Sequence, residues 1–267
     1  MTMQSTAYPV IGQWETLTVD ESPMEVFVAR PAQAAGKGQG PWPVVLVWME
    51  IFGVNEHIVQ VTERVAAEGY VAVALNYYHR TTPNLTLGYT EADVAIGRQH
   101  KEQTTTEGLL ADAQAVLRFL ATLPEVLTTE QVGVMGFCYG GHVAYLLAAM
   151  LPQVAATASF YGGGIAVSAP GGGHPTVCRT PGIRGEILCL FGDEDPLIPL
   201  EQVDAIVGAL QHSGTKHQVV RYPGAGHGFF CNARADYHEA AAADAWQRML
   251  SLFQSHLGQA EESKKAQ

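Results

Sequence analysis

The order of apolar and polar residues along the chain predicts strands and helices that alternate. Period-two alternation near the amino terminus predicts two antiparallel strands at residues 14–19 and 24–29, joined by the turn Asp20-Glu21-Ser22-Pro23. Short, mostly apolar runs predict buried strands farther along the chain. These strands are expected at residues 44–49, 70–75, 131–135, 155–161, 186–191 and 217–222.

Amphipathic segments between these strands predict helices. In residues 107–123 the apolar side chains recur at helical spacing. Four further helices are expected at residues 55–68, 141–150, 200–212 and 239–257. Residues 76–104 have no regular pattern and contain Pro83 and Gly88, so we expect a long surface excursion there. The glycine-rich residues 162–173 predict another loop.

Strands that alternate with helices imply right-handed crossovers, which produce a mostly parallel sheet with helices on both faces. The sequence has no internal repeat, and the Gly- and Ala-rich residues 32–40 do not separate two apolar cores. The 267 residues are therefore expected to form one α/β domain, with its core at about residues 12–257 and a polar tail at 258–267.

Charge and cysteine content exclude several classes of function. The chain carries 15 basic and 26 acidic residues, and its net charge of −11 repels phosphates, so no nucleic-acid partner is expected. Apolar stretches such as residues 143–151 are too short to span a bilayer, and residues 1–6 lack the features of a signal peptide. We therefore expect no membrane partner and a cytoplasmic location. The four cysteines lack paired spacing, so neither a metal, another cofactor nor a disulfide framework is expected.

The segment Gly136-Phe137-Cys138-Tyr139-Gly140 has the G-x-S-x-G pattern of a nucleophile elbow, with cysteine in place of serine. A strand that turns abruptly into a helix strains the nucleophile's backbone, and the residues two before and two after it need to lack side chains. The turn leaves the Tyr139 N–H at a helix amino terminus, where it can stabilise an oxyanion. An inert cysteine in a glycine-rich turn is the alternative, but the flanking strand and helix favour a nucleophile.

An acid and a base are expected to follow the nucleophile in chain order. After the strand at residues 186–191, the chain offers three carboxylates, and we select Asp195 because it lies three residues after Gly192 in a G-x-x-D-x-x-(I/V)-P pattern. Asp193 and Glu194 suit an acidic surface turn that caps the next helix.

The predicted base is His227, which follows the strand at residues 217–222. It lies between Gly226 and Gly228, which let a substrate approach. His142, one turn into a helix, is expected to pack. His79 lies in the excursion and could touch substrate, although a place facing solvent is favoured. Six further histidines in polar or helical contexts are expected at the surface: His57, His100, His212, His217, His238 and His256.

These residues resemble the dienelactone hydrolase family over about residues 44–257. The correspondence is strongest at Glu50-Ile51-Phe52-Gly53-Val54-Asn55, at residues 136–141, at residues 192–199 and at residues 224–229. The resemblance implies an α/β-hydrolase fold and a catalytic triad of Cys138, His227 and Asp195. It identifies the chain as a carboxymethylenebutenolidase-like enzyme that cleaves a small-molecule ester or lactone through a cysteinyl thioester.

The same resemblance implies roles for the loop that contains Glu50. The N–H groups of Ile51 and Tyr139 form the oxyanion hole, and Glu50 contacts the resting thiol and helps to take its proton. Such help is useful because an ordinary thiol, with a pKa of about 8.5, is mostly protonated at neutral pH. From the residues alone, Glu50 could equally be a partly exposed carboxylate that caps a turn.

The substrate stays open because one position departs from the family pattern. Family members that act on dienelactone bind its carboxylate with arginines, one of them four residues after the catalytic histidine, and here that position is Cys231. Arg234, Arg80 and Arg98 are the candidate replacements, although each could be an ordinary surface arginine. A cysteine-dependent thioesterase or acyltransferase, and a non-catalytic ligand sensor with this fold, are the alternatives. The sequence does not predict the oligomeric state.

Overall fold

A single eight-stranded sheet organises the part of the chain that the computed structural model describes, residues 8–32 and 40–258. The strand order is β1-β2-β4-β3-β5-β6-β7-β8, and all pairs from β4 to β8 are parallel. The strands are β1 (Val10–Val19), β2 (Ser22–Pro31), β3 (Val44–Trp48), β4 (Val71–Leu75), β5 (Val132–Phe137), β6 (Val154–Phe160), β7 (Glu186–Gly192) and β8 (His217–Tyr222). Most of the predicted link at 32–40 and of the predicted tail at 258–267 lies outside the described residues.

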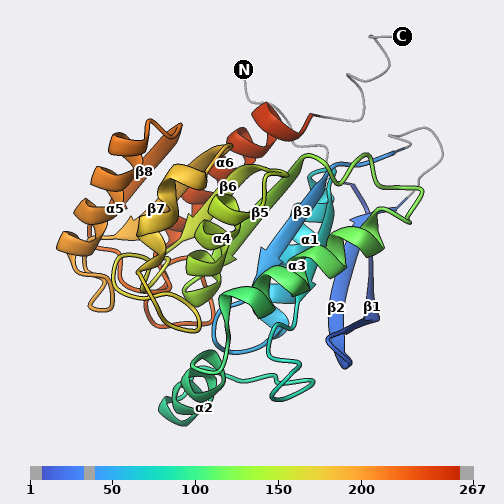
Figure 1. Ribbon diagram of the computed structural model, residues 1–267, viewed down its shortest axis with the longest axis horizontal. Coiled ribbons are helices and arrows are strands. Elements are labelled where there is room, and N and C mark those ends of the chain that lie inside the picture. The colour runs from blue at the N-terminus through green and yellow to red at the C-terminus, as the bar shows by residue number, and fades with distance from the viewer. Residues whose placement is uncertain (1–7, 33–39, 259–267) are drawn as a thin grey trace.

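Six α-helices accompany the sheet among the described residues. They are α1 (Glu56–Ala67), α2 (Glu91–Lys101), α3 (Thr106–Leu120), α4 (Tyr139–Met150), α5 (Leu200–Ser213) and α6 (Glu239–Leu257), and a 3₁₀-helix, η1, spans Thr176–Gly182. In Figure 1, α3, α4 and α5 lie in front of the sheet, whereas α1 and α6 lie behind it. This is the predicted architecture of a mostly parallel sheet with helices on both faces.

The antiparallel hairpin predicted at the amino terminus is confirmed. Strands β1 and β2 pair from Val10↔Pro31 to Val19↔Ser22, so only Asp20 and Glu21 form the turn. Both turn residues have positive φ, 49° and 61°, which is the backbone that suits the right-handed twist of a two-residue hairpin.

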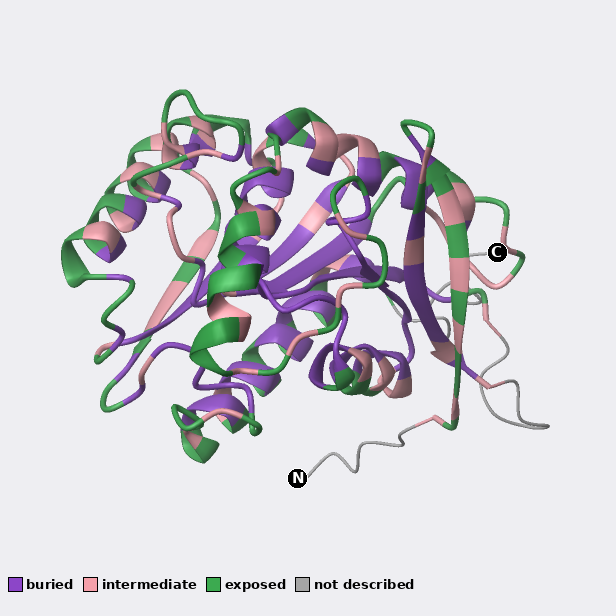
Figure 2. Cartoon of the chain, turned by 90° about the horizontal axis from the view of Figure 1, so that it is seen from below, coloured by how far each residue is buried: buried purple, intermediate pink, exposed green. Residues whose placement is uncertain are grey.

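The core lies on both faces of the central strands. Every residue of β3, β4 and β5 is buried, and in Figure 2 these central strands are purple, while green lies on outward helix faces, on loops and along the edge strand β1. A parallel strand covered on both sides needs apolar residues at consecutive positions, which is why these strands appear in the sequence as continuous apolar runs.

The prediction of an irregular excursion at residues 76–104 is wrong in part, because it contains α2. This helix begins at a capping box, in which the Thr90 hydroxyl accepts from the Asp93 N–H at 3.2 Å and the Asp93 carboxylate accepts from the Thr90 N–H at 3.0 Å. Gly97 is its one buried residue, so α2 lacks the apolar stripe by which the other helices were predicted from the sequence.

Two histidines predicted at the surface are buried instead. His57 lies on the inner face of α1, with its ring 6.0 Å from that of Phe137, and burial lowers its pKa to about 4. The His79 imidazole lies 3.0 Å from a carboxylate oxygen of Asp112 on α3, and both side chains are inaccessible to solvent. His142 packs as expected, because its two ring nitrogens lie 3.0 Å from the Gly163 carbonyl and 2.6 Å from a threonine hydroxyl.

Candidate active site

Cys138 occupies a sharp turn between β5 and α4 and has strained backbone geometry. Its φ of 52° and ψ of −118° lie outside the regions that non-glycine residues normally adopt. A Cβ on Gly136 would lie 2.1 Å from the Gly140 carbonyl oxygen, and one on Gly140 would lie 2.3 Å from the carbonyl oxygens of Trp48 and Met49. Both glycines of the predicted elbow are therefore needed for the close approach of α4 to the ends of β5 and β3.

His227 and Asp195 form a buried pair at the same edge of the sheet. The His227 Nδ1 lies 2.7 Å from one carboxylate oxygen of Asp195, and the other oxygen accepts from the Leu197 N–H at 2.8 Å. The competing carboxylates lie elsewhere, since Asp193 pairs with Arg221 and Glu194 is exposed. Asp195 is thus the carboxylate of this segment that meets the histidine.

The charges around His227 favour its protonated form. Burial by itself lowers the pKa of His227, but the neighbouring Cys138 and Asp195 outweigh burial and raise that pKa to about 10. Asp195 occupies Nδ1, whereas Nε2 is buried and has no hydrogen-bond partner among the described residues. The sulfur of Cys138 is therefore close enough to act on the imidazole.

Glu50, immediately beyond β3, is a buried carboxylate and not the partly exposed cap that was the alternative. Its side chain is 1% exposed, and its Oε1 accepts from Arg234 Nη1 at 2.9 Å. Its Oε2 is buried without a hydrogen-bond partner among the described residues. Burial raises the pKa of Glu50 above 4.5, and the positive charges of Arg234 and His227 oppose that rise.

Arg234 is the predicted carboxylate binder that the fold brings to this site. Its guanidinium carbon lies 5.9 Å from the ring centres of both Phe52 and Tyr89, and 2.6 Å from where a Cβ on Gly228 would be. Gly228, with a φ of +90°, therefore makes room for Arg234, whereas the sequence suggested that it makes room for substrate. Asp236 lies 3.7 Å from the same guanidinium.

The other two candidate arginines are placed differently. The Arg80 guanidinium donates to Asp112 at 2.7 Å and to Asp20 at 2.7 Å, so its charge is neutralised within a structural network between β4 and α3. Arg98 is exposed on α2. Arg234 is the one of the three candidates that contacts Glu50, which makes it the better candidate to bind a substrate carboxylate at this site.

The two amides expected to form an oxyanion hole lie on elements that meet at the elbow. Tyr139 is the first residue of α4, so its N–H has no acceptor within the helix. Ile51 follows Glu50, two residues beyond the Met49 carbonyl that Gly140 approaches. On α2, Gly97 packs against the Ile51 carbonyl, where a Cβ would be 2.4 Å away.

Three tyrosines near the site were not predicted from the sequence. Tyr161, directly after β6, lies with its ring 5.3 Å from that of His227. Tyr89 accepts from Asn55 at 3.1 Å and from the Cys231 thiol at 3.3 Å. Tyr77, just beyond β4, contacts the loop that carries Glu50. The carboxyl ends of parallel strands share one edge of the sheet, so a position just beyond a strand is a signal that a residue lies near the site.

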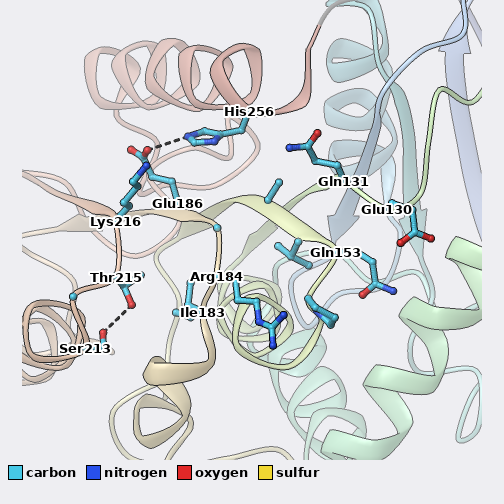
Figure 3. A pocket seen from close by; sticks show the side chains of 15 residues that line it. Glu130, Gln131, Gln153, Ile183, Arg184, Glu186, Ser213, Thr215, Lys216 and His256 are labelled. Carbon is cyan, nitrogen blue, oxygen red and sulfur yellow. Dashed lines mark hydrogen bonds and ion pairs between the residues drawn. The ribbon is translucent and has the colours of Figure 1, made fainter.

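Other features of the described residues do not add to this site. A groove of about 750 Å³ lies at the amino-terminal ends of β6, β7 and β8, at the edge of the sheet opposite to Cys138 (Figure 3). Within residues 8–32 and 40–258, no three His, Cys, Asp or Glu side chains gather as metal ligands do, and no helix could cross a membrane.

Comparison with known proteins gives consistent matches over most of the chain. Residues 24–257 match the model of the Dienelactone hydrolase family. A Synechocystis sp. protein named "Putative carboxymethylenebutenolidase" is 49% identical over 218 residues, 82% of this chain and 88% of that protein. An Escherichia coli (strain K12) protein of the same name is 36% identical over 88% of this chain and 83% of its own length.

Solved structures agree with these matches. A structure described as "Putative Dienelactone Hydrolase" from Klebsiella pneumoniae has a TM-score of 0.82 and 31% identity, over 93% of this chain and 100% of that one. This similarity, together with the family match and the observed sheet, confirms the predicted α/β-hydrolase fold.

Proposed function

The chain belongs to the dienelactone hydrolase family and is a carboxylic ester or lactone hydrolase, and we propose that it works through a thioester formed on Cys138. The observation that carries this proposal is the strained Cys138 at the elbow, beside a buried His227–Asp195 pair. All three positions of the triad carry functional groups, whereas a non-catalytic ligand sensor would not need them.

The first half of the reaction forms the thioester. The Cys138 thiolate adds to the carbonyl carbon, and the carbonyl electrons become an oxyanion that the amides of Ile51 and Tyr139 bind. Collapse of this intermediate breaks the C–O bond of the ester or lactone. The leaving oxygen takes the proton that His227 carries, which is available because the pKa of His227 is raised while the thiolate is present.

The second half hydrolyses the thioester. His227, now neutral, takes a proton from water as the water oxygen adds to the acyl carbon, and the thiolate leaves. Asp195 holds the imidazole so that Nε2 faces the reacting groups and stabilises the imidazolium that forms. The products are a carboxylate and an alcohol or enol, and one proton is released to solvent.

Glu50 and Arg234 connect this chemistry to the substrate. A carboxylate on the substrate that pairs with Arg234 removes the counter-charge from Glu50, and the pKa of that buried carboxyl then rises further. Glu50 thereby becomes a stronger base and takes the proton of the Cys138 thiol when substrate binds. The preferred substrate is a lactone or small activated ester with a carboxylate near the scissile bond.

The proposal is tested with p-nitrophenyl acetate and an anionic enol lactone as substrates. Cys138→Ala and His227→Ala are each expected to lower kcat/KM for both substrates by about 10³-fold or more. Cys178→Ala is the matched control, because Cys178 is an exposed cysteine and its loss is expected to leave both rates unchanged. Full activity of Cys138→Ala on both substrates would refute the mechanism. Transfer of the acyl group to an added alcohol in preference to water would identify an acyltransferase instead.

A further inference from the structure

Tyr77 lies behind the loop that carries Glu50 and donates a hydrogen bond to its backbone. The buried hydroxyl lies 2.9 Å from the Glu50 carbonyl oxygen and 3.0 Å from that of Met49. The ring stacks on Trp48, the last residue of β3, with centres 5.6 Å apart, and meets the ring of Tyr139 edge-on at 6.1 Å. Tyr77 therefore contacts both elements that supply an oxyanion-hole amide.

This hydrogen bond fixes the direction of the Ile51 N–H. The Glu50 carbonyl and the Ile51 N–H belong to one peptide plane, and in a trans peptide they point in opposite directions. The plane lies between the end of β3 at Trp48 and the start of α1 at Glu56, so neither the sheet ladder nor a helix orients it. The Tyr77 hydroxyl supplies the missing constraint, because it holds the carbonyl end of the plane.

We propose that Tyr77 is a positioning residue for catalysis, which aims the Ile51 N–H at the oxyanion and polarises it. A hydrogen bond accepted by the carbonyl strengthens the N–H of the same peptide as a donor, since linked hydrogen bonds polarise one another. Burial holds the pKa of Tyr77 well above its ordinary value, so the hydroxyl keeps its proton over the working pH range. This inference rests on the proposed function, in which the Ile51 amide stabilises the oxyanion.

Tyr145 on α4 provides a matched control. Its side chain is also buried, and its hydroxyl lies 2.5 Å from the hydroxyl of Thr180 on η1. The two tyrosines therefore differ in the group that each hydroxyl holds, because Tyr145 bonds to η1 and Tyr77 bonds to the loop that carries Glu50.

The test compares two reactions of Cys138 in Tyr77→Phe. Hydrolysis of p-nitrophenyl acetate passes through an oxyanion, whereas alkylation by iodoacetamide displaces iodide without forming one. We expect kcat for hydrolysis to fall by about tenfold to a hundredfold, which is no more than the fall that follows removal of a direct oxyanion donor. KM is expected to change by less than about threefold. The alkylation rate is expected to stay within about twofold of wild type, and Tyr145→Phe is expected to leave both reactions at wild-type rates.

Incorporation of 4-aminophenylalanine at position 77 keeps the ring and restores an N–H donor, so it is expected to recover most of kcat. If Tyr77→Phe does not fold, the 4-aminophenylalanine variant is used for the test instead. Loss of hydrolysis in this variant with alkylation intact would contradict the positioning role, because the variant still has an N–H donor at this position. An unchanged kcat in Tyr77→Phe, or an equal fall of hydrolysis and alkylation, overturns the inference. Hydrolysis by wild type that does not depend on Cys138 would instead overturn the proposed function, so the two failures are distinguishable.

Discussion

Replacement of Arg234 by methionine would leave the Glu50 carboxylate buried without its cation. Wild type pairs the two groups at 2.9 Å, with side chains 17% and 1% exposed. Methionine keeps much of the apolar length of arginine but removes the charge. A carboxylate left buried and unpaired typically costs about 3–5 kcal/mol, so the variant is expected to escape part of this cost by protonating Glu50.

The cost of that protonation sets the expected magnitude. A carboxyl with an ordinary pKa of 4.5 costs about 1.36 kcal/mol to protonate for each pH unit above 4.5, which is about 3.4 kcal/mol at pH 7 and about 0.7 kcal/mol at pH 5. In the variant, folded Glu50 holds its proton while the unfolded chain releases it above pH 4.5. The unfolded state therefore binds fewer protons, and the stability of the variant falls as pH rises.

Urea unfolding of wild type and Arg234→Met, followed by circular dichroism between pH 5 and pH 8, measures this difference. We expect Arg234→Met to be less stable by about 3 kcal/mol at pH 7 and by about 1 kcal/mol or less at pH 5. The control is Arg234→Met combined with Glu50→Gln, which has no carboxyl at position 50 to titrate, so its stability should fall less with rising pH than that of Arg234→Met. A difference between wild type and Arg234→Met that is flat over this range would refute the reasoning.

Two further predictions concern carboxylates that differ in their relation to the site. Asp195→Asn removes the charge that orients and stabilises the His227 imidazolium, and kcat for p-nitrophenyl acetate is expected to fall by about 10³-fold or more; a fall of less than tenfold would contradict its assigned role. Asp112→Asn leaves His79 and Arg80 without their buried anion, so the free energy of unfolding is expected to fall by about 2–4 kcal/mol in urea titrations. The kcat of Asp112→Asn is expected to stay within twofold of wild type, and a large loss of kcat without a loss of stability would show that the network serves catalysis.

Features that depend on local backbone physics could be predicted from the sequence. The buried strands β3, β4 and β5 need apolar residues at consecutive positions, and the elbow needs Gly136 and Gly140, so both are visible in short stretches of residues. The candidate positions Cys138, Asp195 and His227 could be predicted in the same way, because each residue comes just beyond a predicted strand. Helix α2 was missed because it is polar, and its only local mark is the Thr90–Asp93 capping box.

Features that depend on the order of strands in the sheet could not be predicted from the sequence. Because β3 lies between β4 and β5, the chain segments just beyond these strands meet, and Glu50, Tyr77 and Cys138 come together although they are far apart in sequence. Two of the surface histidine predictions failed for the same reason, since the elements that cover His57 and His79 come from distant segments.

The choice among the three candidate arginines shows the division most clearly. The sequence supplies Arg80, Arg98 and Arg234 with equal claims, because a guanidinium can reach several ångströms from its backbone in any direction. The tertiary structure pairs Arg80 with Asp112 and Asp20 and folds Arg234 into the space left by Gly228, against Glu50. The sequence by itself therefore determined the strands and the candidate reactive groups that follow them. Long-range packing decided which charge lies beside those groups, since the partner of a flexible side chain depends on what folds against it.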